Sequence, residues 1–76
     1  MSKIHIVDSS EKFKKVFYSE FAEFLHDTFH YNVYEATSFS EKVANGKKLT
    51  LGFPIDSSED YVINKMKELG LIFEIE

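Results

Sequence analysis

The sequence predicts an α+β fold of the ferredoxin-like type, β-α-β-β-α-β, in which a four-stranded antiparallel sheet carries both helices on one face. Three features favour it: short runs of alternating apolar residues, two longer segments whose apolar residues share one helical face, and a repeated corner between these two kinds of segment. In that corner, VDSSEKF at residues 7–13 recurs as IDSSEDY at residues 55–61. One interpretation is that the chain consists of a duplicated β-α-β half. The other is that two helix starts have converged, because Asp-Ser-Ser-Glu suits any well-capped helix. With 76 residues, the chain is expected to form a single domain, residues 1–76.

The first part of the chain is predicted to form a strand and a long helix. Residues 3–7 alternate between two faces, as in a strand. Asp8 or Ser9 then caps a helix over residues 10–30, with Glu11 placed to complete a capping box. The apolar residues of this helix share one arc that is broad enough to cover a sheet. They are Phe13, Phe17, Phe21, Phe24, Leu25 and Phe29.

The middle of the chain admits two interpretations. In the favoured one, residues 31–39 begin a strand that pairs with residues 47–53 through a three-residue loop, residues 44–46. In the other, residues 38–41 form a capping box and the Asn-Gly pair at 45–46 ends a short helical turn. The choice decides how much of the sheet is exposed.

The last part predicts a strand, a helix and a strand. Residues 49–55 alternate cleanly, and Pro54 removes a hydrogen-bond donor near the end of that strand. Residues 56–58 cap a second helix, which ends at Gly70 in the left-handed conformation of a Schellman motif. Residues 71–76 alternate again as the last strand.

The charged residues argue against nucleic-acid binding. All nine basic residues are lysine, against thirteen aspartates and glutamates, which gives a net charge of −4. Phosphate neutralisation dominates the affinity of proteins for nucleic acids, and arginine supplies the planar fork that grips phosphates and guanine edges. An acidic chain without arginine is therefore not expected to bind nucleic acid directly.

Catalysis and membrane insertion also find no support in the sequence. The chain has no cysteine, and its three glycines form neither a Gly-x-Ser-x-Gly elbow nor a phosphate-binding loop. We therefore expect a protein that is not an enzyme, with no catalytic residues and no cofactor. No apolar run is long enough to span a membrane and the N-terminus does not resemble a signal peptide, so a cytoplasmic protein is expected.

Acidic residues of the first predicted helix are the best candidate for a binding surface. Glu20, Glu23 and Asp27 follow one another at positions i, i+3 and i+7, beside the apolar arc. Repulsion between like charges at these spacings costs about 0.2–0.5 kcal/mol per pair, which a basic partner would relieve. The alternative is an ordinary solvated helix face. Glu23, His26 and His30 also have a spacing seen in metal sites, but such sites draw ligands from several helices and the second helix has no histidine, so no metal is expected.

The sheet face opposite the helices is the second candidate surface. It is expected to expose one aromatic residue and several mixed side chains, as a surface for a dimer or a ligand, or as ordinary isolated exposed residues. These residues are His5, Val7, Tyr34, Thr50 and Ile72.

From these features we expect a small acidic, non-enzymatic binding protein. It would dock on a basic surface of a protein partner through Glu20, Glu23, Asp27 and Tyr34, and act as an inhibitor of the kind that phages encode against host or defence enzymes. The alternative is a regulatory domain that forms a homodimer and binds a small ligand or a metal.

Overall fold

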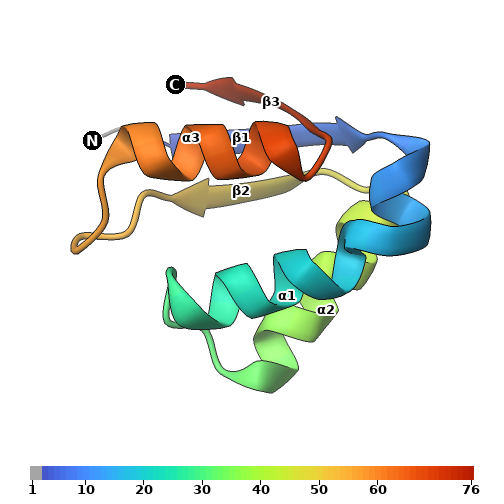
Figure 1. The fold of residues 1–76 in the computed structure, drawn as a ribbon, viewed down its shortest axis with the longest axis horizontal. Helices are drawn as coiled ribbons and strands as arrows, with labels where there is room; N and C mark the ends of the chain where they lie inside the picture. The colour runs from blue at the N-terminus through green and yellow to red at the C-terminus, as the bar shows by residue number, and fades with distance from the viewer. Residues whose placement is uncertain (1–2) are drawn as a thin grey trace.

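The computed structural model describes residues 3–76, which form three strands and three α-helices, the first of them preceded by a π-helical turn. In chain order the elements are β1 (Lys3–Ser9), η1 (Phe13–Phe17), α1 (Tyr18–Asp27), α2 (Val33–Ala44), β2 (Leu49–Gly52), α3 (Glu59–Glu68) and β3 (Leu71–Ile75). Strand β1 lies in the centre of the sheet and pairs antiparallel with β2 on one side and β3 on the other. Helix α3 lies in front of the strands and the α1–α2 pair lies beneath them, on the β2 side (Figure 1).

The predicted ferredoxin-like arrangement is therefore wrong. The class, α+β, is right, but the sheet has three strands and not four, and a pair of helices separates β1 from β2. What remains of the expected topology is its last part, in which α3 connects two parallel strands, β2 and β3, that flank β1.

The error lies in residues 31–46, where the favoured hairpin is replaced by α2. The side chain of Asn32 caps this helix, because its Oδ1 accepts a hydrogen bond of 2.8 Å from the backbone N–H of Glu35. Ala36, Ser40 and Val43 are buried at positions i, i+4 and i+7, which is the spacing of one helical face. The helix ends in the Asn-Gly pair at 45–46, as the second interpretation proposed, but it begins well before the predicted capping box.

The repeated corner marks two equivalent helix caps. Ser10 Oγ accepts a hydrogen bond of 3.2 Å from the N–H of Phe13, and Ser58 Oγ accepts one of 3.1 Å from the N–H of Tyr61. The capping residue is thus the second serine of each copy, and the prediction of Asp8 or Ser9 for the first helix is wrong. The chain before the two caps differs, since the first copy begins inside β1 while Ile55 lies in an exposed turn. The repeat therefore does not extend to a duplicated β-α-β unit.

The first helix contains a π-helical turn, η1, that matches the spacing of its phenylalanines. Phe13, Phe17 and Phe21 are four residues apart, and in a regular α-helix each such step moves the side chain about 40° around the axis. A wider turn reduces this drift and keeps the three rings directed towards the core, where Phe13 and Phe21 meet edge to face at 5.5 Å. The helix ends at Asp27, three residues before the predicted end.

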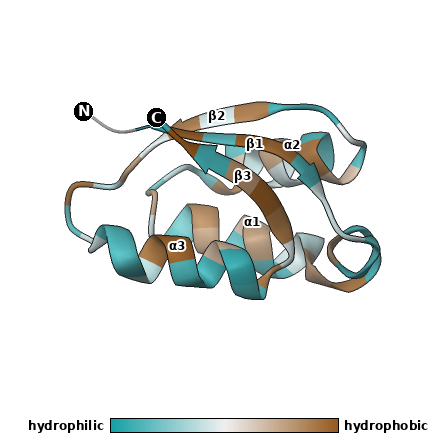
Figure 2. Cartoon of the chain, turned by 90° about the horizontal axis from the view of Figure 1, so that it is seen from above, coloured by the Kyte–Doolittle hydropathy of each residue, from teal (hydrophilic) through white to brown (hydrophobic). Residues whose placement is uncertain are grey.

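The core lies between the sheet and the three helices. Its central residues are Ile4 and Ile6 of β1, both fully buried, and α3 lies on the same side of the strands as α1 (Figure 2). The other face of the sheet is open, and His5 lies there between Thr50 of β2 and Glu74 of β3. His5 Nδ1 is 3.1 Å from Thr50 Oγ1, and its Nε2 donates to the carboxylate of Glu76 at 2.8 Å.

Two glycines with the same backbone conformation offer a test of the packing between the first helix and β3. Gly46 and Gly70 have φ values of 81° and 82°, a region in which a Cβ costs about 1–2 kcal/mol. A Cβ at Gly46 would meet no other atom, whereas one at Gly70 would collide with Ser10 Oγ, the cap of the first helix.

We therefore expect Gly46→Ala to lower the free energy of unfolding by about 1–2 kcal/mol. Gly70→Ala should cost about 1 kcal/mol more, because displacing Ser10 also removes a cap. Urea denaturation of both variants measures the difference, and equal losses would contradict the packing described for Ser10.

Candidate functional site

Three carboxylates form a row on the exposed side of α1, here called the acidic ridge. Glu20, Glu23 and Asp27 are all exposed, as the sequence predicted. Within residues 3–76 none of the three forms an ion pair, since the ion pairs found there involve other carboxylates. The ridge therefore presents its negative charge to solvent without a direct ion pair from the described residues.

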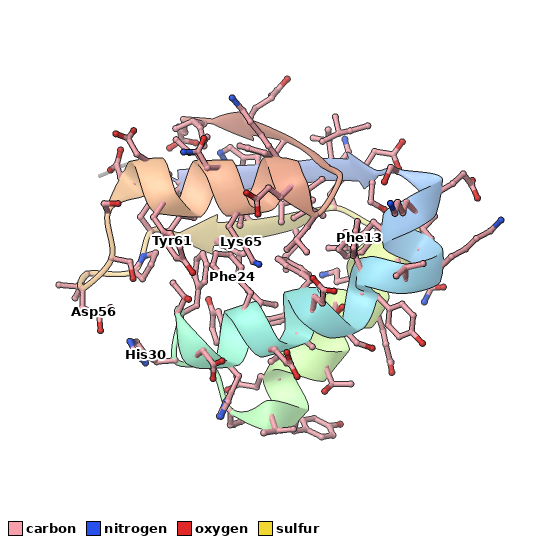
Figure 3. The ribbon with its side chains drawn as sticks, in the orientation of Figure 1. Phe13, Phe24, His30, Asp56, Tyr61 and Lys65 are labelled. Atoms are coloured by element: carbon pink, nitrogen blue, oxygen red, sulfur yellow. The ribbon has the colours of Figure 1, made fainter. Side chains whose placement is uncertain are left out.

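A groove runs along each side of the ridge. The groove between α1 and α3 has a volume of about 360 Å³, and its walls include Phe24 and Asp27 on one side and Tyr61 and Lys65 on the other. In Figure 3, Tyr61 and Lys65 extend from α3 towards α1, where Phe24 lies. Lys65 thus borders the acidic ridge from across the groove without pairing with it.

The groove between α1 and α2 has a volume of about 420 Å³, and small side chains, Ala22, Ala36 and Thr37, are among its lining residues. It is lined by Ala22, Glu23, His26, Asp27, Val33, Ala36 and Thr37. Val33 and Thr37 also border a shallow depression beside Tyr34 on the outer side of α2. The acidic ridge, the groove and Tyr34 therefore form one continuous surface, here called the α1–α2 face.

Tyr34 and Val33 are the apolar residues of this face that are most open to solvent. Tyr34 is 84% exposed and Val33 is 65% exposed, at the start of α2. The prediction that Tyr34 lies on the open face of the sheet is wrong, because residues 33–44 are helical. The exposure of Tyr34 was nevertheless predicted. Helix α2 places Tyr34 next to the groove between α1 and α2, which the acidic ridge borders on its other side.

The two histidines of the possible metal site point to different partners. His26 Nδ1 donates a hydrogen bond of 2.8 Å to the carbonyl oxygen of Tyr31, and His30 Nε2 is 2.8 Å from the carboxylate of Asp56. Within the described residues, no three histidine, aspartate or glutamate side chains lie close enough together to hold a metal ion.

Comparisons with known proteins assign this chain to no family. No family model matches it, and the searches of curated proteins and of solved structures found no match. The interpretation of the site therefore rests on its geometry. None of the helices in residues 3–76 is both long and apolar enough to cross a membrane.

The pair of His30 and Asp56 joins two loops that are far apart in the sequence (Figure 3). His30 ends the turn after α1 in the left-handed region, with φ 64°, and Asp56 lies in the loop between β2 and α3. A hydrogen bond from His30 is the main cause that lowers the pKa of Asp56 below its ordinary value of 3.8. Sequence reasoning missed this pair because no local pattern links residues 26 positions apart.

Because the pKa of Asp56 is lowered in the folded state, its ionised form stabilises the protein above pH 3.8, and this contribution is lost as the pH falls through the lower folded value. We expect Asp56→Asn to lower the free energy of unfolding at pH 5–7, and the gap between variant and wild type to close as the pH falls below 3.8. Urea denaturation of wild type and Asp56→Asn, at a series of pH values from 7 to below 3.8, measures this difference in the free energy of unfolding. Glu41→Gln, which removes an exposed carboxylate that forms no ion pair within residues 3–76, is the control, and a gap that is independent of pH would contradict the role given to the pair.

Proposed function

We propose that this protein is a cytoplasmic, non-enzymatic binding protein that docks through its α1–α2 face on a basic surface of a protein partner. The observation that carries the proposal is the acidic ridge, whose three carboxylates are exposed and form no ion pair in the described chain, beside the exposed ring of Tyr34. A second feature, the small-residue groove between the ridge and Tyr34, offers space for a side chain of the partner.

The free protein carries the acidic ridge at an energetic disadvantage. Glu20, Glu23 and Asp27 repel one another along the helix, at about 0.2–0.5 kcal/mol per pair. Asp27 is also the last residue of α1, where the negative end of the helix dipole disfavours a carboxylate. A basic partner reverses both effects, and no ion pair among residues 3–76 has to be broken at the ridge for it to bind.

The net charge of −4 adds a longer-range attraction. Complementary charge raises the rate of encounter and makes binding sensitive to salt, because ions screen charges over about 8 Å at physiological ionic strength. Tyr34 and Val33 then supply apolar contact at the edge of the charged area, and tyrosine is enriched among the residues that dominate binding energy. This face therefore combines charge for encounter with an aromatic side chain for short-range contact.

Inhibition is the activity that such docking produces most directly. A basic groove on a partner is usually a site for an anionic ligand, and an acidic domain that occupies it excludes that ligand. We therefore propose an inhibitor of a protein with a basic groove.

The first test reverses the charge of the ridge. Purified partner, isolated by capture on the immobilised protein and identified by mass spectrometry, is titrated with wild type and with the triple variant Glu20→Lys, Glu23→Lys, Asp27→Lys. We expect the variant to bind at least about a hundredfold more weakly, which corresponds to about 2.8 kcal/mol. The wild-type affinity should fall as salt is raised.

The control for this test is the triple variant Glu11→Lys, Glu59→Lys, Glu68→Lys. This variant has the same net charge as the ridge variant, and its substitutions are at exposed positions away from the α1–α2 face. Urea denaturation verifies that both variants are folded. Equal weakening by the two variants would mean that net charge alone matters, and would contradict the α1–α2 face as the binding surface.

The second test concerns Tyr34. Because its ring is 84% exposed, Tyr34→Ala should change the free energy of unfolding by no more than about 0.5 kcal/mol. It should nevertheless weaken partner binding by about tenfold or more, as truncation of an interface aromatic does. Ile55→Ala, at a fully exposed apolar residue in the loop before α3, is the matched control and should bind like wild type. Wild-type affinity of Tyr34→Ala would remove Tyr34 from the interface.

A further inference from the structure

The two edge strands of the sheet differ in length and composition, since β2 is LTLG and β3 is LIFEI. Strand β2 lies on the side of the α1–α2 pair (Figure 1), and within residues 3–76 it pairs with β1 and contacts α2. Strand β3 forms the opposite edge; it likewise pairs only with β1 among the described residues, and it contacts α3. An uncovered edge presents a row of backbone groups that are free to pair with another strand.

The hydrogen bonds at the two ends of β3 show which of its backbone groups face outwards. Ser10 N donates to Gly70 O at 2.9 Å, and Glu76 N donates to Lys3 O at 2.9 Å. In an antiparallel pair, the backbone N–H and C=O groups of successive residues point alternately towards the partner strand and away from it. The irregularity in the pairing lies on β1, between Ile6 and Asp8, so this alternation continues without a break along β3. The even-numbered residues from 70 to 76 therefore bond to β1. Leu71, Phe73 and Ile75 direct their N–H and C=O groups to the open edge.

The side chains of β3 give this edge little protection. Proteins usually guard an exposed edge with lysine, proline, a bulge in the edge strand or a very short strand. Here the strand reads LIFEI, with one charged residue, and it is hydrophobic over most of its length (Figure 2). Ile72 and Ile75 are 52% and 42% exposed. The edge is therefore suited to an apolar strand of similar composition.

We propose that β3 pairs antiparallel with β3 of a second copy of this chain, with the twofold axis at Phe73, so that one continuous sheet runs through a homodimer. In this register Leu71 lies opposite Ile75 of the second copy and the two Phe73 residues lie opposite each other. Every outward-facing backbone group of the strand then gains a hydrogen-bond partner. The cross-strand pairs on the helix side are all apolar, and aromatic pairs of this kind stabilise sheets.

The neighbouring registers are less favourable. With the axis at Glu74, the two glutamates would face each other, and like charges directly opposite are destabilising. With the axis at Ile72, the strands would overlap over fewer residues and Ile75 would keep its backbone groups unpaired within the strand. A shift of the axis by one residue in either direction thus loses hydrogen bonds between the two strands. The shift to Glu74 also adds repulsion between the two glutamates.

The dimer leaves the α1–α2 face free. That face belongs to the helix pair on the β2 side of the sheet, whereas β3 lies on the opposite side (Figure 1). Two copies would therefore present two such faces, and a partner with two basic sites would be held by both. The dimer itself does not depend on the proposed function.

The first test is the mass in solution, measured by size exclusion with light scattering. Wild type is expected at about twice 8.9 kDa. Ile75→Pro removes an outward-facing N–H without removing a bond to β1, and edge strands tolerate proline there, so it should be a folded monomer of 8.9 kDa. Ile75→Val keeps the N–H and should remain a dimer, and circular dichroism checks the fold of each. A wild type that is monomeric at all concentrations, or a dimeric Ile75→Pro, would overturn the proposal.

The second test fixes the register, and the absence of cysteine from the chain makes it simple. Opposite residues that share backbone hydrogen bonds have Cα atoms about 5.5 Å apart, which suits a disulfide. Under oxidation, Phe73→Cys should form a covalent dimer, whereas Ile72→Cys and Glu74→Cys should not. Cross-linking of either of the latter in place of Phe73→Cys would overturn the register, and cross-linking of none would overturn the pairing of β3.

Discussion

The fold depends on the burial of β1 between two antiparallel neighbours. Both edges of this strand are paired, and Ile4 and Ile6 on its inner face are completely buried. Because β1 comes first in the chain and lies in the middle of the sheet, every later element is placed relative to it. The α1–α2 pair returns the chain to one edge of β1, and α3 carries it across to the other. Apolar side chains on one face of β1 therefore determine where both candidate surfaces lie.

This arrangement separates two surfaces that differ in character. The α1–α2 face is acidic, with an aromatic residue beside a groove, and suits encounter with a basic partner. The β3 edge is apolar and offers backbone hydrogen bonds, and suits a strand of the same composition. A small domain can thus use one face for charge-dependent binding and an opposite edge for self-association, without either disturbing the core.

Much of the fold could be predicted from the sequence, because local signals agree with the tertiary structure there. The first strand, the first helix, the second helix cap at Ser58, the end of α3 at Gly70 and the last strand all carry strong periodicity or capping residues. The middle failed because Val33 and Tyr34 have high strand propensity and the residues after them alternate well enough for a strand. The features that identify the helix are the cap at Asn32 and the burial of Ala36, Ser40 and Val43 on one helical face. In the sequence this spacing is weak, because the same residues are also compatible with two strands.

The candidate site was predicted in part. The exposure of Glu20, Glu23 and Asp27 followed from the helical periodicity that placed the phenylalanines in the core. Their proximity to Tyr34 did not follow, because it requires α2 to lie beside α1. The pair of His30 with Asp56 could not be predicted either, since it joins two loops whose approach is set by the tertiary structure and not by any local pattern.

The central claim is that residues 33–44 form a helix packed beside α1, because the α1–α2 face and the three-stranded order of the sheet both follow from it. Backbone NMR assignment tests this most directly. The account predicts helical Cα secondary shifts over residues 33–44 and cross-strand contacts from β1 to both β2 and β3. Extended shifts over residues 31–39, with contacts between that segment and residues 47–53, would show a hairpin in place of α2 and contradict it.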